Sequence, residues 1–153
     1  MKRTRIHLLL LLGVTMSISA VTNKTITIQC PQNCNQNNAV SIDLVYVSSS
    51  VNQQLAILGN YSARDWFNAK SSILAQYSQY LFVESIETVP NLSFNHPIKG
   101  KKHFSYNADY ERFDVGAIYV YVNMINTNTT TTFNITNREH VTLTINDFDI
   151  GMY

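Results

Sequence analysis

The sequence predicts a mainly β protein, an antiparallel β-sandwich with an α-helical insertion between its early strands. Three observations predict this class. Several short segments alternate apolar and polar residues with the period of two that a half-buried strand requires. One segment near the middle of the chain instead spaces its apolar residues three and four apart, as an amphipathic helix does. The connections late in the chain are short, which favours antiparallel pairing between strands that pack as two sheets.

Residues 1–20 have the features of a secretory signal peptide. Three basic residues open the chain, an apolar run follows over 8–16, and the sequence SISA supplies the small residues of a cleavage site. The run is shorter than the roughly 20 apolar residues that a membrane-spanning helix needs. We therefore expect export and cleavage near Ala20. The expected location is periplasmic or outer-membrane-associated, with an extracellular location as the alternative.

Two strands are predicted before the helical insertion. Residues 25–28 alternate threonine and isoleucine, and we assign residues 21–39 to an N-terminal strand and a polar loop that contains both cysteines. The sandwich domain is expected to follow over 40–153, beginning with a stronger strand over 40–47. One face of that strand carries Val40, Ile42, Leu44 and Tyr46, and the other begins with Ser41 and Asp43.

The helical insertion is predicted over about 51–81. A short helix capped within 48–50 is expected to end at Gly59. Residues 62–65 then resemble a capping box, with Asp65 in the position that Glu usually takes. The apolar stripe of the longer helix behind this cap consists of Trp66, Ala69, Ile73, Leu74, Tyr77 and Leu81.

The remaining strands are predicted from local composition. A β-rich segment over 82–89 stops at Pro90, and residues 90–112 form the least regular part of the chain. Residues 115–125 are apolar on both faces, which is typical of a central strand buried on both sides. A turn is expected over 126–132, and shorter strands over 132–136 and 141–145. The prediction is five or six strands in all.

Cys30 and Cys34 are the only cysteines. In an exported protein an isolated pair is most often a disulfide, although closing so short a loop stabilises the fold little. Free or intermolecular thiols are the alternative. Acylation of Cys30 is disfavoured, because the residues before it do not resemble a lipoprotein processing site.

Catalytic and metal-binding motifs are absent from the sequence. His96, His103 and His140 lack the spacing of metal ligands, and neither a nucleophile elbow nor a phosphate-binding loop occurs. The acidic residues within 109–114 and 146–149 are interpreted as solvated loops. We expect no enzyme activity, no cofactor and no metal. A formal charge of +1 also argues against electrostatic binding of nucleic acid.

Two sets of residues are candidate partner contacts. Lys99, Lys101 and Lys102 lie in the irregular segment after Pro97, where the alternative is an ordinary solvated loop. Phe67 follows Trp66, and consecutive helical residues point about 100° apart. If Trp66 centres on the core stripe, Phe67 lies nearer its edge. Phe67 is therefore a candidate contact, with core packing as the alternative reading.

The order of these elements resembles the type VI secretion outer-membrane lipoprotein family. The resemblance is carried by SIDLVYV (41–47), ARDWFNA (63–69), VESIETVPN (83–91), VGAIYVYVN (115–123) and HVTLTIND (140–147). It implies a two-sheet, transthyretin-like sandwich that is tethered to the outer membrane. It also implies docking on the periplasmic part of a large inner-membrane anchor protein. The sequence departs from the family in having no lipobox after the leader, which implies a soluble periplasmic form or another anchor.

These observations lead to one functional hypothesis and two alternatives. The hypothesis is a periplasmic, outer-membrane-associated structural or docking component of a type VI-like secretion apparatus, whose partners are other envelope proteins. The first alternative is a secreted adhesion or ligand-binding β-domain, with or without glycans. Five glycosylation sequons occur, which is weak evidence in a chain so rich in Asn, Ser and Thr. The second alternative is a periplasmic enzyme or inhibitor with an unrecognised site.

Overall fold

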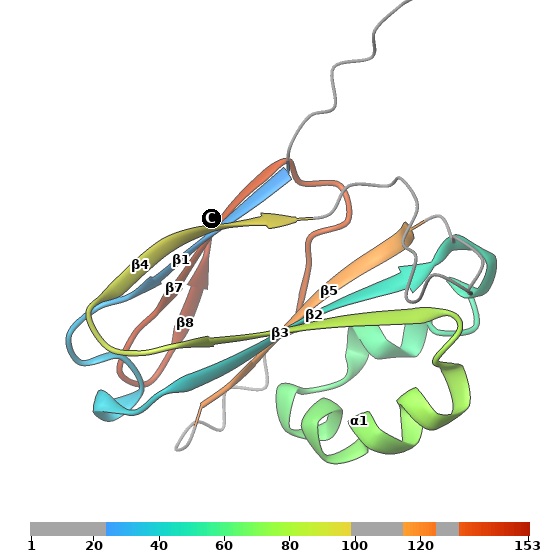
Figure 1. Ribbon diagram of the computed structural model, residues 1–153, viewed down its shortest axis with the longest axis horizontal. Coiled ribbons are helices and arrows are strands. Elements are labelled where there is room, and N and C mark those ends of the chain that lie inside the picture. The colour runs from blue at the N-terminus through green and yellow to red at the C-terminus, as the bar shows by residue number, and fades with distance from the viewer. Residues whose placement is uncertain (1–23, 99–114, 125–131) are drawn as a thin grey trace, which may run out of the picture.

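The computed structural model describes residues 24–98, 115–124 and 132–153 (Figure 1). They form two four-stranded sheets and one α-helix, so the predicted mainly β sandwich is confirmed. The first sheet has the order β4 (Leu92–Ile98), β1 (Lys24–Cys30), β7 (His140–Ile145), β8 (Ile150–Met152). The second has the order β3 (Leu81–Thr88), β2 (Val40–Ser48), β5 (Val115–Asn123), β6 (Thr132–Asn134).

The eight strands in the described part of the chain exceed the predicted five or six. Strand β4 lies inside the segment that the sequence analysis treats as irregular, and the short β8 was not predicted. The segment set apart as 21–39 is not separate from the sandwich, because β1 is an inner strand of the first sheet. The predicted signal peptide over 1–20 and most of the predicted turn over 126–132 lie outside the described residues.

One strand pair departs from the antiparallel expectation. β1 and β7 run parallel, with a register from Thr25 opposite His140 to Gln29 opposite Thr144. Parallel neighbours need a long connection, and here the whole second sheet lies between the two strands in the sequence. The local pattern of either strand contains no signal for this pairing, so the first sheet is mixed.

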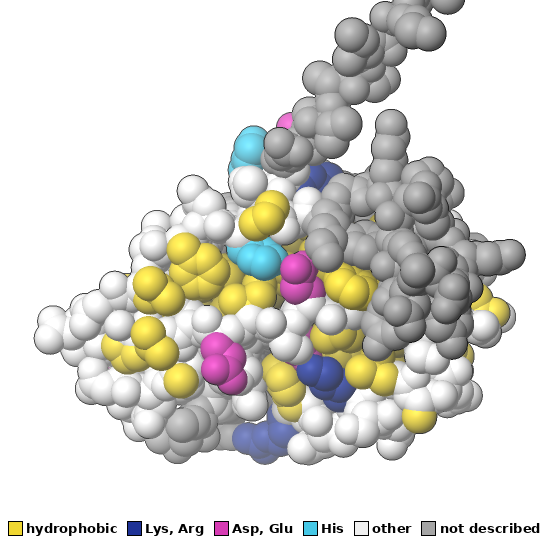
Figure 2. Space-filling view, in the orientation of Figure 1, with side chains coloured by type: hydrophobic (Ala, Val, Ile, Leu, Met, Phe, Trp, Pro, Cys, Tyr) yellow, Lys and Arg dark blue, Asp and Glu magenta, His cyan; other side chains and the backbone are white. Residues whose placement is uncertain are grey.

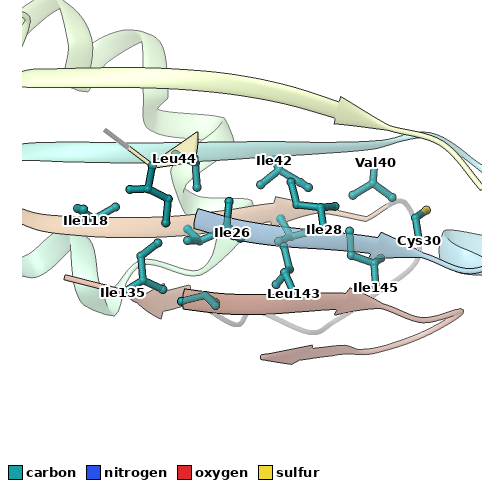
Figure 3. Packing of buried hydrophobic residues seen from close by; sticks show 14 of the residues in the cluster. Ile26, Ile28, Cys30, Val40, Ile42, Leu44, Ile118, Ile135, Leu143 and Ile145 are labelled. Carbon is teal, nitrogen blue, oxygen red and sulfur yellow. The ribbon is translucent and has the colours of Figure 1, made fainter. Parts of the chain in front are cut away.

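The main core lies between the sheets. Ile26 and Ile28 of β1 are fully buried, and so are Ile42 and Leu44 of β2. Figure 3 shows these side chains pointing toward one another from the two layers. The alternation in β2 was predicted to place its four even-numbered apolar residues on one face, and all four belong to this cluster.

A second core lies between the outer face of the second sheet and the helical insertion. Helix α1 (Ala63–Tyr77) places Trp66 there with no exposed surface. The indole stacks on Tyr121 of β5, with ring centroids 4.9 Å apart and an interplanar angle of 11°. Because Ile118 and Val120 of the same strand face the main core, β5 is buried on both faces, as predicted.

The insertion begins with short 3₁₀ turns rather than the predicted short α-helix. They are η2 (Ser49–Val51) and η3 (Ala56–Asn60). The prediction that Gly59 ends the short helix as its cap is wrong, because η3 continues to Asn60 and no described glycine has a positive φ. A Cβ at Gly59 would lie 3.1 Å from the ring of Tyr119, so glycine allows a close approach there instead.

The start of α1 follows the prediction. The Ser62 hydroxyl accepts a hydrogen bond from the Asp65 N–H at 3.0 Å, and the Asp65 carboxylate accepts one from the Ser62 N–H at 3.3 Å. This reciprocal capping box satisfies two N–H groups that the helix leaves open. No helix in the described part of the chain is both long and apolar enough to cross a membrane.

Candidate docking surface

Three connections lie together at one end of the sandwich (Figure 1). They are the loop 31–39 between β1 and β2, the turn 89–91 between β3 and β4, and the turn 146–149 between β7 and β8. We call this set the loop end. The strand register explains the grouping, since Cys30 at the end of β1 lies opposite Leu92 at the start of β4. Figure 3 shows Cys30 beside Val40, which follows the same loop, and Ile145, which precedes the turn 146–149.

The two cysteines lie at the base of the loop 31–39. Cys30 and Cys34 are both buried, and their Cα atoms are 5.3 Å apart, so their sulfur atoms lie at disulfide distance. A bond between them ties the start of the loop to the last residue of β1. The pair therefore belongs to the structure of the loop end.

The tip of the loop has an unusual backbone conformation. Asn35, Gln36 and Asn37 follow one another with φ angles of 47°, 54° and 63°. Left-handed backbone costs a residue with a side chain roughly 1–2 kcal/mol, although Asn tolerates it better than most. Consecutive residues persist in this region only where their surroundings hold them, and such backbone concentrates at binding and switch sites.

Hydrogen bonds from the rest of the loop end hold this backbone. The Asn35 N–H donates to the carbonyl of Asn146 at 3.0 Å, and the Gln36 N–H donates to Oδ1 of Asp147 at 2.9 Å. The buried amide of Asn35 also donates to the carbonyl of Ala39 at 2.8 Å. The loop is thus fastened both to itself and to the turn 146–149, which makes it a fixed protrusion.

Apolar side chains are exposed around this protrusion. Five large hydrophobic residues are exposed in the described part of the chain. Val89 (50%) and Phe148 (60%) belong to the loop end, and Leu92 (40%) directly follows its turn 89–91. The other two, Ile57 and Tyr153, lie elsewhere. Figure 2 shows hydrophobic side chains over β3 and β4 that reach this end of the molecule. Exposed aromatic and aliphatic groups around a rigid loop are suited to a protein interface.

Of the sequence-predicted contact residues, the structure describes only Phe67. Lys99, Lys101 and Lys102 lie outside the described residues, and Pro97, from which their loop was expected to start, is part of β4. Phe67 is half-buried against the core under α1, with Nζ of Lys70 6.0 Å from its ring centroid. The structure thus gives Phe67 a packing contact.

The acidic residues over 146–149 were interpreted as a solvated loop rather than a cation site. Within the described ranges, no group of three His, Cys, Asp or Glu side chains could hold a metal ion. Asp147 instead accepts the N–H of Gln36, so its carboxylate fixes the neighbouring loop. The cluster within 109–114 lies outside the described residues.

Sequence reasoning missed a buried carboxylate behind the helix. Asp43 of β2 is 1% exposed and accepts three hydrogen-bond or ion-pair contacts. Its partners are Nε1 of Trp66 at 2.7 Å, Oγ of Ser85 at 2.6 Å and Nζ of Lys70 at 2.9 Å. The signal in the sequence is an aspartate inside an otherwise apolar strand. These contacts fasten α1 to the second sheet, and we interpret the cluster as structural.

Comparison with solved structures finds the same fold in a secretion lipoprotein. The chain is similar to the crystal structure of the T6SS lipoprotein TssJ1 from Pseudomonas aeruginosa, with a TM-score of 0.54 and 10% identity over 84% of this chain and 92% of that chain. It is also similar to Serratia marcescens Lip, a membrane-bound component of the type VI secretion system. That match has a TM-score of 0.47 and 8% identity, and covers 86% of this chain and 97% of Lip.

The likeness establishes a shared fold. The chain has the fold of TssJ1, so the predicted resemblance to type VI secretion lipoproteins is confirmed at the level of the fold. No protein-family model and no curated protein matches the sequence.

Proposed function

We propose that this protein is an envelope component of a type VI-like secretion apparatus and works by binding another protein through the loop end. The partner is the periplasmic part of an envelope anchor protein. The fold of TssJ1 supports the setting. The main support for placing the binding site at the loop end is the loop 31–39. Its left-handed tip is held by hydrogen bonds to the turn 146–149.

A loop fixed in this way is suited to docking. Binding loses affinity when a flexible segment must be ordered, and a loop that is already ordered avoids this cost. The exposed apolar groups of Val89, Leu92 and Phe148 favour binding, because burying apolar surface in an interface contributes about 25 cal/mol of free energy per Å². The polar atoms of Asn35 and Asp147 are engaged in holding the loop. This arrangement favours binding over catalysis at the loop end.

The direction of β1 supports the same assignment. The strand begins at Lys24 and ends at Cys30, where the loop 31–39 starts. Seven residues of strand span roughly 20 Å. Any anchor that acts from the N-terminal end of β1 would therefore leave the loop end facing away from the outer membrane, toward a partner that reaches across the periplasm.

Co-purification of matched variants tests this function. Phe148 and Ile57 are exposed to nearly the same extent, at 60% and 58%, but only Phe148 lies at the loop end. Phe148→Ser is expected to reduce recovery of the anchor protein's periplasmic part at least tenfold, while Ile57→Ser leaves it unchanged. Equal recovery with both variants would remove the loop end from the interface.

A further inference from the structure

A polar cleft lies on the helix-bearing side of the second sheet, away from the loop end. Its walls are the segment of η2 and η3 on one side and the residues after β6 on the other, and its floor is the start of β5. The cleft has a volume of about 510 Å³, within the range of sites that hold small ligands. The cleft and the loop end lie at opposite ends of β5. The cleft is at the start of this strand, whereas Asn123 at its other end lies opposite Ser41, close to the loop 31–39.

The floor of the cleft contains the hydroxyl of a nearly buried tyrosine, which has no partner among the described residues. Tyr119 is 5% exposed and lines the cleft, and its hydroxyl makes no hydrogen bond to any described residue. The other deeply buried tyrosines differ, because Tyr121 donates to the carbonyl of Leu58 at 2.5 Å and Tyr46 donates to Glu84 at 3.1 Å. The Tyr119 hydroxyl opens onto the cleft, where it is available to a ligand.

The walls carry further polar side chains, which are exposed to solvent. Gln53, Asn137 and Arg138 line the cleft, and their side chains make no hydrogen bond or ion pair with a described residue. By contrast, Thr136 and Asn134 satisfy each other, with the hydroxyl donating to Oδ1 at 2.6 Å. The cleft therefore presents one guanidinium, two amides and one tyrosine hydroxyl toward the same space.

We propose that this cleft binds a short extended peptide that ends in a free carboxylate. The guanidinium of Arg138 matches one carboxylate, which a planar fork of donors can bind through two hydrogen bonds. The amides of Gln53 and Asn137 each offer a donor and an acceptor, which complement the N–H and C=O groups of a peptide backbone. The hydroxyl of Tyr119 donates to a carbonyl, and burial raises its pKa above 10.0, so it keeps its proton.

A titration of the full exported chain with a simple peptide tests this site. The probe is acetyl-Gly-Ala-Gly with a free carboxylate, and the control ligand is the same peptide with a carboxamide end. In ¹⁵N-labelled protein we expect saturable shifts at Gln53, Tyr119, Asn137 and Arg138, with at least tenfold weaker binding of the carboxamide. The proposal is overturned if the two peptides bind equally, if no saturable shift occurs, or if a neutral disaccharide binds these residues as well as the peptide.

Variants separate recognition from folding. Arg138→Gln is expected to weaken binding of the carboxylate peptide at least fivefold, whereas Arg64→Gln, on an exposed position of α1, leaves it unchanged. Tyr119→Phe removes only the hydroxyl, so it should weaken binding while the melting temperature of the free protein stays the same or rises. Unchanged binding in both cleft variants would overturn the assignment, whatever the outcome of the docking experiment.

Discussion

Trp66 donates its indole N–H to the buried carboxylate of Asp43, at 2.7 Å, across the boundary between α1 and the second sheet. The same carboxylate accepts a hydrogen bond from the Ser85 hydroxyl and forms an ion pair with Lys70, so both of its oxygen atoms have partners. The indole ring meanwhile stacks on Tyr121. One aromatic residue therefore joins the helical insertion to the sandwich through both an apolar and a polar contact, so the position of the insertion depends on it.

Truncating this residue should destabilise the whole fold. Trp66→Ala removes a fully buried aromatic side chain and leaves the Asp43 carboxylate short of a donor, so we expect a loss of about 3–5 kcal/mol in the free energy of unfolding. Urea denaturation followed by circular dichroism measures it. A loss below about 1 kcal/mol would mean that the insertion contributes little to the stability of the sandwich.

The carboxylate itself should be equally sensitive. Asp43→Leu leaves the Trp66 N–H and the Lys70 ammonium group without their buried acceptor, and breaking a buried pair in this way costs about 3–5 kcal/mol. Lys70→Met should cost less, because the Lys70 side chain is 28% exposed and its charge is partly solvated. The same denaturation experiment compares them. If Lys70→Met proved the more damaging variant, the cluster would be organised around the lysine instead.

The buried tyrosines predict a fall in stability at alkaline pH. Burial raises the pKa of Tyr121 far above its ordinary value of 10.0, and the neighbouring Tyr119 and Tyr61 add to the effect. Above pH 10 the tyrosine therefore loses its proton in the unfolded chain but keeps it in the folded chain. The stability that protonated Tyr121 contributes is full below pH 10 and is lost as the pH rises further. Unfolding measured from pH 8 to 12 should show this decline, with a shallower slope in Tyr121→Phe. Identical slopes would contradict it.

The cysteine pair should order the loop more than it stabilises the fold. The double variant Cys30→Ser, Cys34→Ser removes a link across so short a loop that the chain-entropy loss is at most about 2 kcal/mol. Hydrogen exchange should show a larger effect, with faster exchange of the Asn35 and Gln36 amides. The core amides of β5 serve as the internal control. Unchanged exchange at the loop would show that the hydrogen bonds to the turn 146–149 suffice.

Much of the fold could be predicted because the decisive signals are local. The two apolar faces of residues 115–123 predict a central strand, and the capping box at Ser62 predicts the start of α1. Strand β4 was missed because it contains Pro97 and exposes alternate residues. A proline is tolerated there because β4 lies at the edge of its sheet. The parallel pairing of β1 and β7 depends on contacts more than a hundred residues apart.

The loop end shows where sequence patterns stop being informative. The run of asparagines after Cys34 predicts a polar loop, but the left-handed conformation of Asn35 depends on a carbonyl contributed by Asn146. Asp43 was placed on the correct face of its strand, yet its partners come from α1 and β3. In both cases the function or stability of a residue rests on partners that only the folded chain brings close.

Site-specific photo-crosslinking in cells tests the docking account most directly. A photoreactive amino acid replaces Asn37, at the exposed tip of the loop 31–39, or Gln54, an exposed control position in the helical insertion. The account predicts that the variant at Asn37 yields an adduct that mass spectrometry identifies as the envelope anchor protein, and that the variant at Gln54 does not. An anchor adduct from Gln54 and none from Asn37 would contradict it.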